Sequence, residues 1–455
     1  MLRADKNAMR QTSLALMCLA LAGCGGGSGA SIDSASDAPI DFDAAQCSAD
    51  SQKSWVRTSM EDYYLFYDQL PDVNALDYDG PEEFIRALRV APFDNYSYVT
   101  DAASNSALFE EGKRFGFGMR LQRAANSKLF FTLAEPHSPV GAAGIRRGDE
   151  LLAMNGVTPA NFTDEFIISA FGESDEAIDL TLTIRRDEQS LPEDITVTKS
   201  LYDVQTVLDT RVLQHNNNRV GYLNFLSFLE TSELELNQAF NTLKEENVDE
   251  LVLDLRHNGG GRISVAEQLG SLIAGDAVEN MTFTRFAYND KYASQDSSFL
   301  FKERSSALNL PRVYVLTSPD TCSASEMVIN SLRPFVDVVT IGDRTCGKPY
   351  ATRSRERCGK SINALEIDLL NAANVGGYFE GLAADCPVAE NFSQQLGDPS
   401  ESLLGAALFH IDTNQCESVF ASASSNTRSL FDKQGQTNPS VIDPSYDEIR
   451  PLLSQ

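Results

Sequence analysis

Residues 251–261 read LVLDLRHNGGG, an apolar run followed by a charged segment and three consecutive glycines. The apolar run predicts a buried β-strand. The glycines predict a loop in which the backbone can approach a ligand closely and present its N–H groups to it. Such a loop can bind either phosphate or an oxyanion. It is not a P-loop, because no Gly-Lys-Ser/Thr follows.

The segments on both sides of this loop alternate between strand and helix patterns. The predicted strands are 220–223, 313–316 and 336–341, and the predicted helices are 232–246, 264–274 and 324–333. Nearly continuous apolar strands that alternate with helices predict a sheet covered on both faces. Closer to the N-terminus, residues 48–110 are rich in aromatic side chains and predict a small helical bundle with an aromatic core, to which we assign no chemistry.

A serine-containing turn follows the strand predicted at 313–316, where residues 321–326 read TCSASE. Ser323 and Glu326 have the spacing of a helix capping box, and a purely structural cap is one interpretation. The alternative is a serine at a helix N-terminus, where N–H groups and the helix dipole stabilise an oxyanion. Such a serine needs a base, and Lys348, in the loop after the next strand, can serve if burial lowers its pKa.

Residues 138–156 read SPVGAAGIRRGDELLAMNG and resemble the PDZ domain, matching its helix, its Gly-Asp turn and a strand that ends in Asn-Gly. A PDZ domain adds a peptide C-terminus as a strand to a sheet edge and holds the carboxylate in a nest of backbone N–H groups. The resemblance implies that Phe115, Gly116, Phe117 and Gly118 form this carboxylate loop. The alternative is a PDZ domain that only packs against its neighbour.

Together these segments resemble the C-terminal processing proteases, the tail-specific serine peptidases of the S41 family. The matching pieces are DLRHNGGG, TCSASEM and IGDRTCGK, and the resemblance covers nearly all of residues 48–350. It implies Ser323 as nucleophile, Lys348 as general base, and the amides of Ala324 and Gly260 as the oxyanion hole. It also implies a protease core of the crotonase/ClpP-like αβ type.

Two positions depart from the family pattern. Many members carry a glutamine at the position of Thr352 and an acidic residue at the position of Pro334. Threonine can still accept a hydrogen bond from a lysine, so Thr352 is kept as a catalytic candidate that orients Lys348. His257 lies next to the glycine loop, but nothing in the resemblance makes it the base, and we rank it below Lys348.

The first residues have the features of an export signal, since basic residues precede an apolar run that is too short to span a bilayer as a helix. The run ends in LAGC at residues 21–24, which looks like a bacterial lipobox with Cys24 as the lipidated residue. A buried apolar helix with a chance cysteine is the alternative. A Gly- and Ser-rich tether follows. We expect a lipid-anchored protein of the bacterial cell envelope, on its periplasmic or extracellular side.

The cysteines beyond the signal indicate disulfides, because an exported chain is oxidised. They are Cys47, Cys322, Cys346, Cys358, Cys386 and Cys416. Short sequence separation favours the pairs Cys346–Cys358 and Cys386–Cys416, and Cys322, which adjoins Ser323, is the cysteine least expected to pair. The chain has no C-x-x-C spacing and its histidines are scattered, so we expect no metal site.

We expect a multidomain α+β protein. The predicted parts are a lipoprotein signal peptide at 1–23, a flexible tether at 24–47, an N-terminal helical domain at 48–111, a PDZ domain at 112–204 and an S41-type peptidase domain at 205–455. The net charge of -28 repels phosphate backbones, so no nucleic-acid partner is expected.

The predicted function is that of an exported, lipid-anchored serine endopeptidase. It would cleave polypeptides with a Ser–Lys dyad, without a metal or organic cofactor, and its PDZ domain would read substrate C-termini. The alternative is a catalytically weak or inactive peptide-binding protein that keeps the S41 fold. The sequence makes no prediction of the oligomeric state.

Overall fold

The computed structural model describes residues 47–124, 127–172 and 176–416. The predicted signal peptide and the lipidation candidate Cys24 lie outside these residues. Among the helices that are described, none combines the length and the apolar character needed to cross a membrane.

A six-stranded sheet forms the centre of the C-terminal part, with the strand order β20-β15-β14-β11-β10-β9. All neighbouring pairs run parallel except the edge pair β10 and β9, which is antiparallel. The strands are β9 (Val207–His215), β10 (Asn218–Phe225), β11 (Glu250–Asp254), β14 (Arg312–Thr317), β15 (Asp337–Gly342) and β20 (Cys386–Pro387). The strands predicted from the apolar runs are therefore present.

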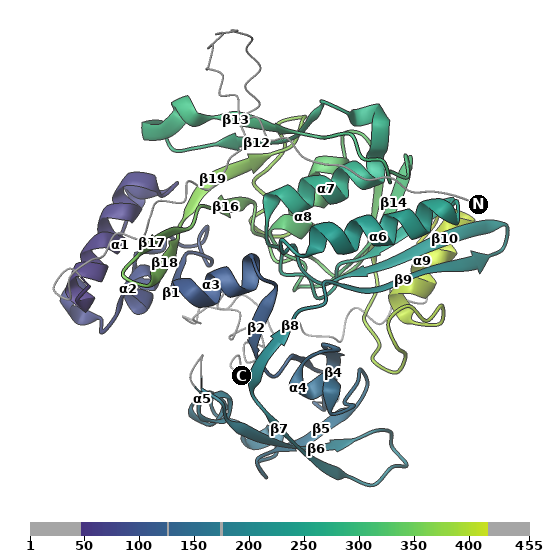
Figure 1. Cartoon of the computed structure of the whole chain (residues 1–455), viewed down its shortest axis with the longest axis horizontal. Helices are drawn as coiled ribbons and strands as arrows, with labels where there is room; N and C mark the ends of the chain where they lie inside the picture. Colours follow the sequence, from purple (N-terminus) through teal and green to yellow (C-terminus); the bar gives the residue numbers. More distant parts are fainter. Residues whose placement is uncertain (1–46, 125–126, 173–175, 417–455) are drawn as a thin grey trace, which may run out of the picture. The chain divides into compact units, whose positions relative to one another are not determined.

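Helices cover both faces of this sheet, as the sequence predicts. Successive side chains of a strand point to opposite faces, so Leu253 and Val315 pack on one side while Tyr222 and Leu316 pack on the other. The first side is covered by α6 (Ser232–Glu245), α7 (Ile263–Ala274) and α8 (Ala324–Leu332), and the second by α9 (Ser402–Thr413) (Figure 1).

A second, antiparallel sheet has the order β13-β12-β19-β16. Its strands are β12 (Thr282–Ala287), β13 (Ser297–Leu300), β16 (Tyr350–Thr352) and β19 (Leu365–Leu370), with η4 (Gly275–Val278) before β12 and η5 (Asp290–Gln295) between β12 and β13. Phe283, Ile367 and Leu369 from this sheet belong to the same buried cluster as α7 and α8. The sheet therefore closes the open side of the helical layer.

The N-terminal region is helical, but it does not enclose a core of its own. Its elements are α1 (Ala49–Tyr63), η1 (Tyr67–Gln69), η2 (Ala75–Asp77), α2 (Pro81–Leu88), β1 (Tyr98–Asp101) and α3 (Ala102–Phe109). Val56 and Phe84 pack in one buried cluster with Ile362 and Leu365 of the C-terminal half. Strand β1 pairs with β18 (Lys360–Asn363), which pairs with β17 (Arg355–Arg357) (Figure 1). The predicted helices and their aromatic core are present, but the core is shared with the C-terminal half, because helices this short need a partner surface to bury their apolar faces.

Residues 113–203 surround a separate apolar core that contains Phe117, Phe131, Ile167 and Leu182. The sheet order is β3-β4-β5-β6-β7, and β2 pairs with β8 beside it. The elements are β2 (Lys113–Gly116), β3 (Met119–Arg123), β4 (Leu129–Ala134), α4 (Pro139–Ala142), β5 (Glu150–Met154), η3 (Pro159–Asn161), α5 (Asp164–Phe171), β6 (Asp179–Arg185), β7 (Glu193–Thr198) and β8 (Ser200–Asp203). Strand β3 lies at the edge of its sheet, as strand addition of a peptide requires.

Candidate active site

Ser323 occupies the N-cap position of α8, in the turn that follows β14. Its φ of 56° and ψ of -111° are uncommon for a residue with a Cβ, and such strained backbone is concentrated at functional sites. Two hydrogen bonds hold this turn against the segment that follows β11. The Thr321 hydroxyl donates to the Leu255 carbonyl at 2.8 Å, and the Cys322 N–H donates to the Asn258 carbonyl at 3.0 Å. Ser323 itself is partly exposed, so its hydroxyl can meet a substrate.

The side chain of Glu326 connects the serine turn to the lysine loop. Its Oε2 accepts hydrogen bonds from the N–H of Ser323 at 2.9 Å and from the N–H of Lys348 at 2.8 Å. Its Oε1 accepts from the N–H of Gly347 at 2.8 Å and from the Thr345 hydroxyl at 2.5 Å. Burial raises the pKa of Glu326, although these donors oppose the rise. The glutamate of the predicted capping box therefore also fixes the loop of the candidate base.

Lys348 is buried, and its Nζ has no hydrogen bond or ion pair with any described residue. The Nζ lies 5.5 Å from the centroid of the Tyr96 ring. Burial lowers the pKa of Lys348 to about 8, and the charges of Asp94 and Glu326 oppose this fall. A substantial fraction of this lysine is therefore neutral near pH 8 and can accept a proton.

Ser323 and Lys348 come from adjacent loops at one edge of the main sheet, as the parallel pairing of β14 and β15 predicts. No hydrogen bond joins the Ser323 hydroxyl to Lys348 Nζ in the structure. Catalytic hydrogen bonds are often long in ligand-free enzymes and shorten when substrate binds. The structure thus brings the two backbone segments together without closing the side-chain contact.

Asp94 and Tyr96 of the N-terminal region form part of the surroundings of Lys348, and the sequence analysis missed them. The Tyr96 hydroxyl donates to the carbonyl oxygen of Cys346 at 2.9 Å. The Asp94 carboxylate accepts from the N–H groups of Tyr96 and Ser97 at 2.8 Å each and from the Tyr64 hydroxyl at 2.8 Å. No sequence signal identifies them, because 250 residues separate Tyr96 from Cys346.

Gly260 lies directly against the serine turn. A Cβ on this residue would lie 2.8 Å from the Cys322 carbonyl oxygen and 2.9 Å from the Ala324 nitrogen, and its φ is 101°, so only glycine fits. However, the Gly260 N–H donates to Asn258 Oδ1 at 2.9 Å. In this conformation Gly260 therefore allows the close approach of the serine turn, and its N–H is bonded to Asn258 instead of being available as the predicted oxyanion donor. The N–H of Ala324 belongs to the first turn of α8, where a helix cannot satisfy its own donors.

The remaining predicted residues have weaker support. Thr352 lies on β16, and no hydrogen bond joins it to Lys348 among the described residues, so its orienting role remains a prediction. His257 is buried, and neither ring nitrogen has a hydrogen-bond partner in the described part of the chain. Burial lowers the pKa of His257 below its usual value, so the imidazole is neutral. Pro334 is exposed just beyond the end of α8.

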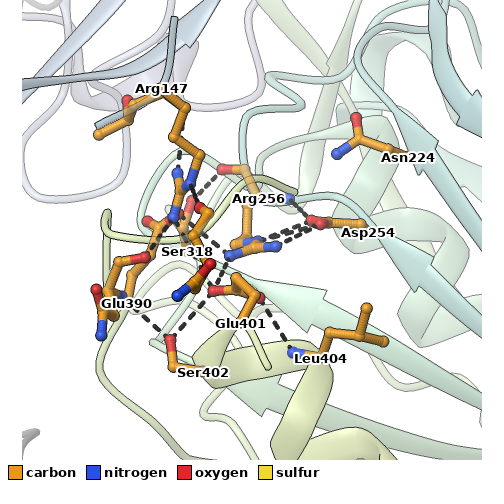
Figure 2. Close-up of polar contacts among 12 residues, drawn as sticks. Arg147, Asn224, Asp254, Arg256, Ser318, Glu390, Glu401, Ser402 and Leu404 are labelled. Carbon is orange, nitrogen blue, oxygen red and sulfur yellow. Dashed lines mark hydrogen bonds and ion pairs between the residues drawn. The ribbon is translucent and has the colours of Figure 1, made fainter. Parts of the chain in front are cut away.

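A buried ionic network surrounds the start of the glycine loop (Figure 2). Arg256 pairs with Asp254 at 2.6 Å, with Glu401 at 2.8 Å and with Glu390 at 3.2 Å. Burial by itself lowers the pKa of Arg256, but these three carboxylates outweigh it and hold the pKa above the ordinary value. Glu390 also pairs at 2.8 Å with Arg147 of the segment that resembles a PDZ domain. One carboxylate thus bridges that segment and the glycine loop.

The predicted carboxylate loop lies where the resemblance places it, ahead of the edge strand β3. Phe115 and Gly116 end β2 and pair with β8. Phe117 is buried, with its ring 5.4 Å from that of Phe171 of α5. Gly118 has a φ of 76°, and a Cβ there would overlap Ser138. The glycine is therefore required by the turn itself, and peptide binding by this loop remains a prediction.

Three disulfides are present among the described residues: Cys47–Cys358, Cys322–Cys346 and Cys386–Cys416. The predicted pair Cys386–Cys416 is confirmed. The predicted pair Cys346–Cys358 is wrong, and Cys322, the cysteine least expected to pair, is bonded to Cys346. Spatial proximity decides pairing rather than sequence separation, and the folded serine and lysine loops bring the Cα atoms of Cys322 and Cys346 within 5.2 Å.

Three family models match the chain: peptidase family S41 over residues 219–387, the peptidase S41 N-terminal domain over 51–98 and the PDZ domain over 106–185. These matches agree with the fold: a helical N-terminal region, a PDZ domain and an S41 protease core.

Two curated relatives are called carboxyl-terminal-processing protease. The one from a Picosynechococcus species is 26% identical over 235 residues, which is 51% of this chain and 54% of the relative. The one from a Synechocystis species is 24% identical over 269 residues, which is 59% of this chain and 58% of the relative. The matched regions therefore span little more than half the length of these relatives.

Among solved structures, a Bacteroides fragilis protein described as an S41 protease superposes with a TM-score of 0.64 at 24% sequence identity. The match covers 79% of this chain and 97% of the other. It shows that the two chains share a fold.

Proposed function

Because the chain belongs to the S41 peptidase family, we propose that it is a serine endopeptidase in which Ser323 is the nucleophile and Lys348 is the general base. The observation that carries this proposal is the double hydrogen bond to one atom of Glu326. The N–H groups of both residues bind the same carboxylate oxygen, Oε2, at 2.9 and 2.8 Å. This shared anchor fixes the positions of a partly exposed serine and a buried lysine relative to each other.

The electrostatics of the site support the assignment of the base. Lys348 has no ionic partner among the described residues, and burial lowers its pKa to about 8. The neutral amine takes the proton from the Ser323 hydroxyl as the oxygen attacks the scissile carbonyl. The protonated lysine then gives the proton to the leaving amine, and a water molecule releases the acyl group by the same route in reverse. His257 is less suitable, because it lacks the connection through Glu326 that joins the backbone of Lys348 to that of Ser323.

The developing oxyanion needs N–H donors next to Ser323. The Ala324 N–H is the donor that the geometry supports best, because it belongs to the unsatisfied first turn of α8. The Gly260 N–H is bonded to Asn258 Oδ1. If a glycine of residues 259–261 supplies the second donor, this loop must change its hydrogen bonds when substrate binds. We therefore propose that the structure represents a resting form of the enzyme.

We propose that the substrates are polypeptides and that the PDZ domain reads their C-termini. The edge position of β3 and the loop at 115–118 in front of it support this role. A peptide with a free, apolar C-terminus should then be cleaved faster than the same peptide with an amidated end, because amidation removes the charge that the loop would bind. Equal rates for the two peptides would show that the PDZ domain does not read carboxylates.

We also propose that Cys24 carries a lipid and that the enzyme works at the bacterial cell envelope. The lipobox pattern at residues 21–24 motivates this, and these residues lie outside the described part of the chain. Replacing Cys24 by alanine should move the protein from the membrane fraction to the soluble fraction or leave its signal uncleaved. A processed protein that still fractionates with the membrane would contradict the proposal.

The nucleophile can be tested by labelling with a fluorophosphonate and locating the label by mass spectrometry. We expect the label on Ser323, no label and no peptide cleavage in Ser323→Ala, and retained labelling in Ser325→Ala, the matched neighbour. Because Ser–Lys enzymes label slowly, cleavage is the decisive readout. Cleavage at the normal rate after Ser323→Ala would refute the assignment. It would mean either that another residue is the nucleophile or that the chain is a binding protein and a contaminating peptidase cleaves the substrate.

A further inference from the structure

The Cys322–Cys346 disulfide lies inside the candidate active site, and the proposed mechanism does not use it. Cys322 directly precedes Ser323, and Cys346 precedes Lys348 by one intervening glycine. The bond therefore joins the two loops that carry the nucleophile and the base. The same loops are also tied through the backbone, since the Cys346 N–H donates to the Thr321 carbonyl at 3.0 Å.

The disulfide also touches the carboxylate that fixes both loops. Cys346 Sγ lies 3.2 Å from Glu326 Oε2, the atom that accepts the N–H groups of Ser323 and Lys348. In the oxidised form this sulfur has no hydrogen and cannot compete for the oxygen. A free Cys346 thiol would be a third donor to the same atom. Reduction would thus weaken the anchor of the two loops while it removes the covalent tie between them.

We propose that the Cys322–Cys346 disulfide holds Ser323 and Lys348 in their working positions and that its reduction switches the peptidase off reversibly. The proposal concerns the regulation of the same site and rests on the proposed roles of Ser323 and Lys348. Displacements of about 1 Å in a catalytic pair lower rates by about a hundredfold, so a tie this close to both residues can control the rate.

The chemistry of the switch is thiol–disulfide exchange with a protein or small-molecule dithiol. A thiolate of the dithiol attacks one sulfur, the S–S bond of the enzyme breaks, and a mixed disulfide forms. The second thiolate of the reductant then displaces the remaining cysteine. Two electrons and two protons pass to the enzyme, which gains two thiols, and the dithiol becomes a disulfide. A small disulfide oxidant reverses the reaction.

The exposure of the two cysteines decides which sulfur is attacked. Both cysteines pack in the apolar cluster that contains Val56 and Tyr64 of the N-terminal region, but Cys346 is partly exposed and Cys322 is buried. A reductant therefore reaches the sulfur of Cys346 first. Cys322 remains packed in the cluster after reduction, so we expect the fold to persist while the lysine loop shifts.

The other two disulfides provide matched controls within the same molecule. Cys47–Cys358 ties the start of α1 to the turn between β17 and β18, and Cys386–Cys416 ties β20 to the end of α9. Neither contains a residue next to Ser323 or Lys348 in the sequence. Losing either bond removes a covalent tie of the fold but leaves the contact with Glu326 unchanged.

The test compares peptide cleavage by the full chain with that of two double variants, Cys322→Ser/Cys346→Ser and Cys386→Ser/Cys416→Ser, before and after treatment with dithiothreitol. In the untreated enzymes we expect kcat of Cys322→Ser/Cys346→Ser to be at least tenfold lower with little change in KM. We expect Cys386→Ser/Cys416→Ser to keep the parental kcat.

Dithiothreitol should lower kcat of the parent and of Cys386→Ser/Cys416→Ser, and oxidised glutathione should restore it. Cys322→Ser/Cys346→Ser should not respond to either.

Two readouts separate positioning from stability. Circular dichroism at the assay temperature must show that the reduced parent is folded, and the pH–rate profile of the residual activity should change shape, because Lys348 has moved. If Cys322→Ser/Cys346→Ser matches the parent in kcat, or if it still loses activity in dithiothreitol, the proposed redox switch is refuted, while the Ser–Lys assignment is unaffected. If Ser323→Ala or Lys348→Arg retains normal cleavage, the proposed function fails instead.

Discussion

Two buried cations, Lys348 and Arg256, lie in the loops that follow β15 and β11, the strands on either side of β14, and they differ in their ionic partners. Both side chains are almost completely removed from solvent. Arg256 is paired with three carboxylates, and its pKa is raised. Lys348 has no ionic partner among the described residues, and burial lowers its pKa to about 8. Ion pairs thus outweigh the desolvation of Arg256, whereas the more distant charges of Asp94 and Glu326 only partly offset the desolvation of Lys348.

The difference distinguishes a charge that stabilises the fold, that of Arg256, from the titratable charge of the proposed base, Lys348. A fully paired arginine remains protonated and holds the glycine loop in place. An unpaired buried lysine is destabilising while it is charged, and it releases its proton at a pH where a serine needs a base. Burial alone therefore does not distinguish the proposed base from a structural cation, whereas the set of ionic partners does.

The largest effect is expected when Lys348 is made permanently charged. Lys348→Arg should lower kcat/KM by about four orders of magnitude, because a guanidinium remains protonated and cannot accept the Ser323 proton. The loss should be no larger in the double variant with Ser323→Ala, since the two residues act as one unit. Peptide cleavage assays measure this. Near-normal activity in Lys348→Arg together with its loss in His257→Ala would instead establish a Ser–His mechanism.

The second effect concerns stability. Arg256→Met should lower the free energy of unfolding by about 3 to 5 kcal/mol, because it leaves the buried Asp254 without a cation and leaves Glu390 and Glu401 with Arg147 alone. Urea unfolding followed by the fluorescence of Trp55, the single tryptophan, can measure the loss. An unchanged midpoint would mean that water or Arg147 compensates the three carboxylates, and the contrast with Lys348 would then lose its basis.

The same substitution at Lys348 should have the opposite sign. Lys348→Met should raise the free energy of unfolding at pH 6 by about 2 to 3 kcal/mol, because it removes an unpaired buried charge. The lysine is protonated in both states below about pH 8, so the gain is complete there. It should decrease as the pH rises from about 8 toward 10.5, since the native lysine is then already neutral. A loss of stability at pH 6 would indicate an unseen partner of Nζ.

The smallest effect tests the contribution of the N-terminal region. The charge of Asp94 raises the pKa of Lys348, so Asp94→Asn should shift the rising limb of the pH–rate profile to lower pH by up to about 1 unit. Asparagine can still accept the N–H groups of Tyr96 and Ser97. The profile of kcat/KM between pH 6 and 10 gives the answer, and a shift to higher pH would exclude an electrostatic role for Asp94.

Local patterns in the sequence predicted most of the core but little of what surrounds the site. Apolar runs and helical spacing gave the parallel strands and α6, α7 and α8, because each pattern reflects burial within a single element. Parallel pairing then placed Ser323 and Lys348 at one sheet edge. Glu326 was recognised only as a cap, since its contacts with Gly347 and Lys348 depend on a loop from another strand.

Contacts between distant segments could not be predicted in this way. The N-terminal region contains apolar and aromatic residues at helical spacing, which indicates helices but does not identify the surface that buries them. The pairing of β1 with β18, the position of Tyr96 beside Lys348 and the Cys322–Cys346 bond all depend on the complete fold. The N–H of Gly260 was assigned to the oxyanion, but the Asx turn made by Asn258 decides its partner.

The position of the N-terminal region against the lysine loop has a consequence for when activity can appear. Asp94 and Tyr96 are synthesised early, whereas Cys346, Lys348 and the β17–β18 hairpin follow some 250 residues later. The surroundings that lower the pKa of Lys348 are therefore incomplete on any shorter nascent chain. In the proposed mechanism, a partly folded chain would therefore have its serine but no neutral lysine to act as the base, and we expect no cleavage before folding is complete.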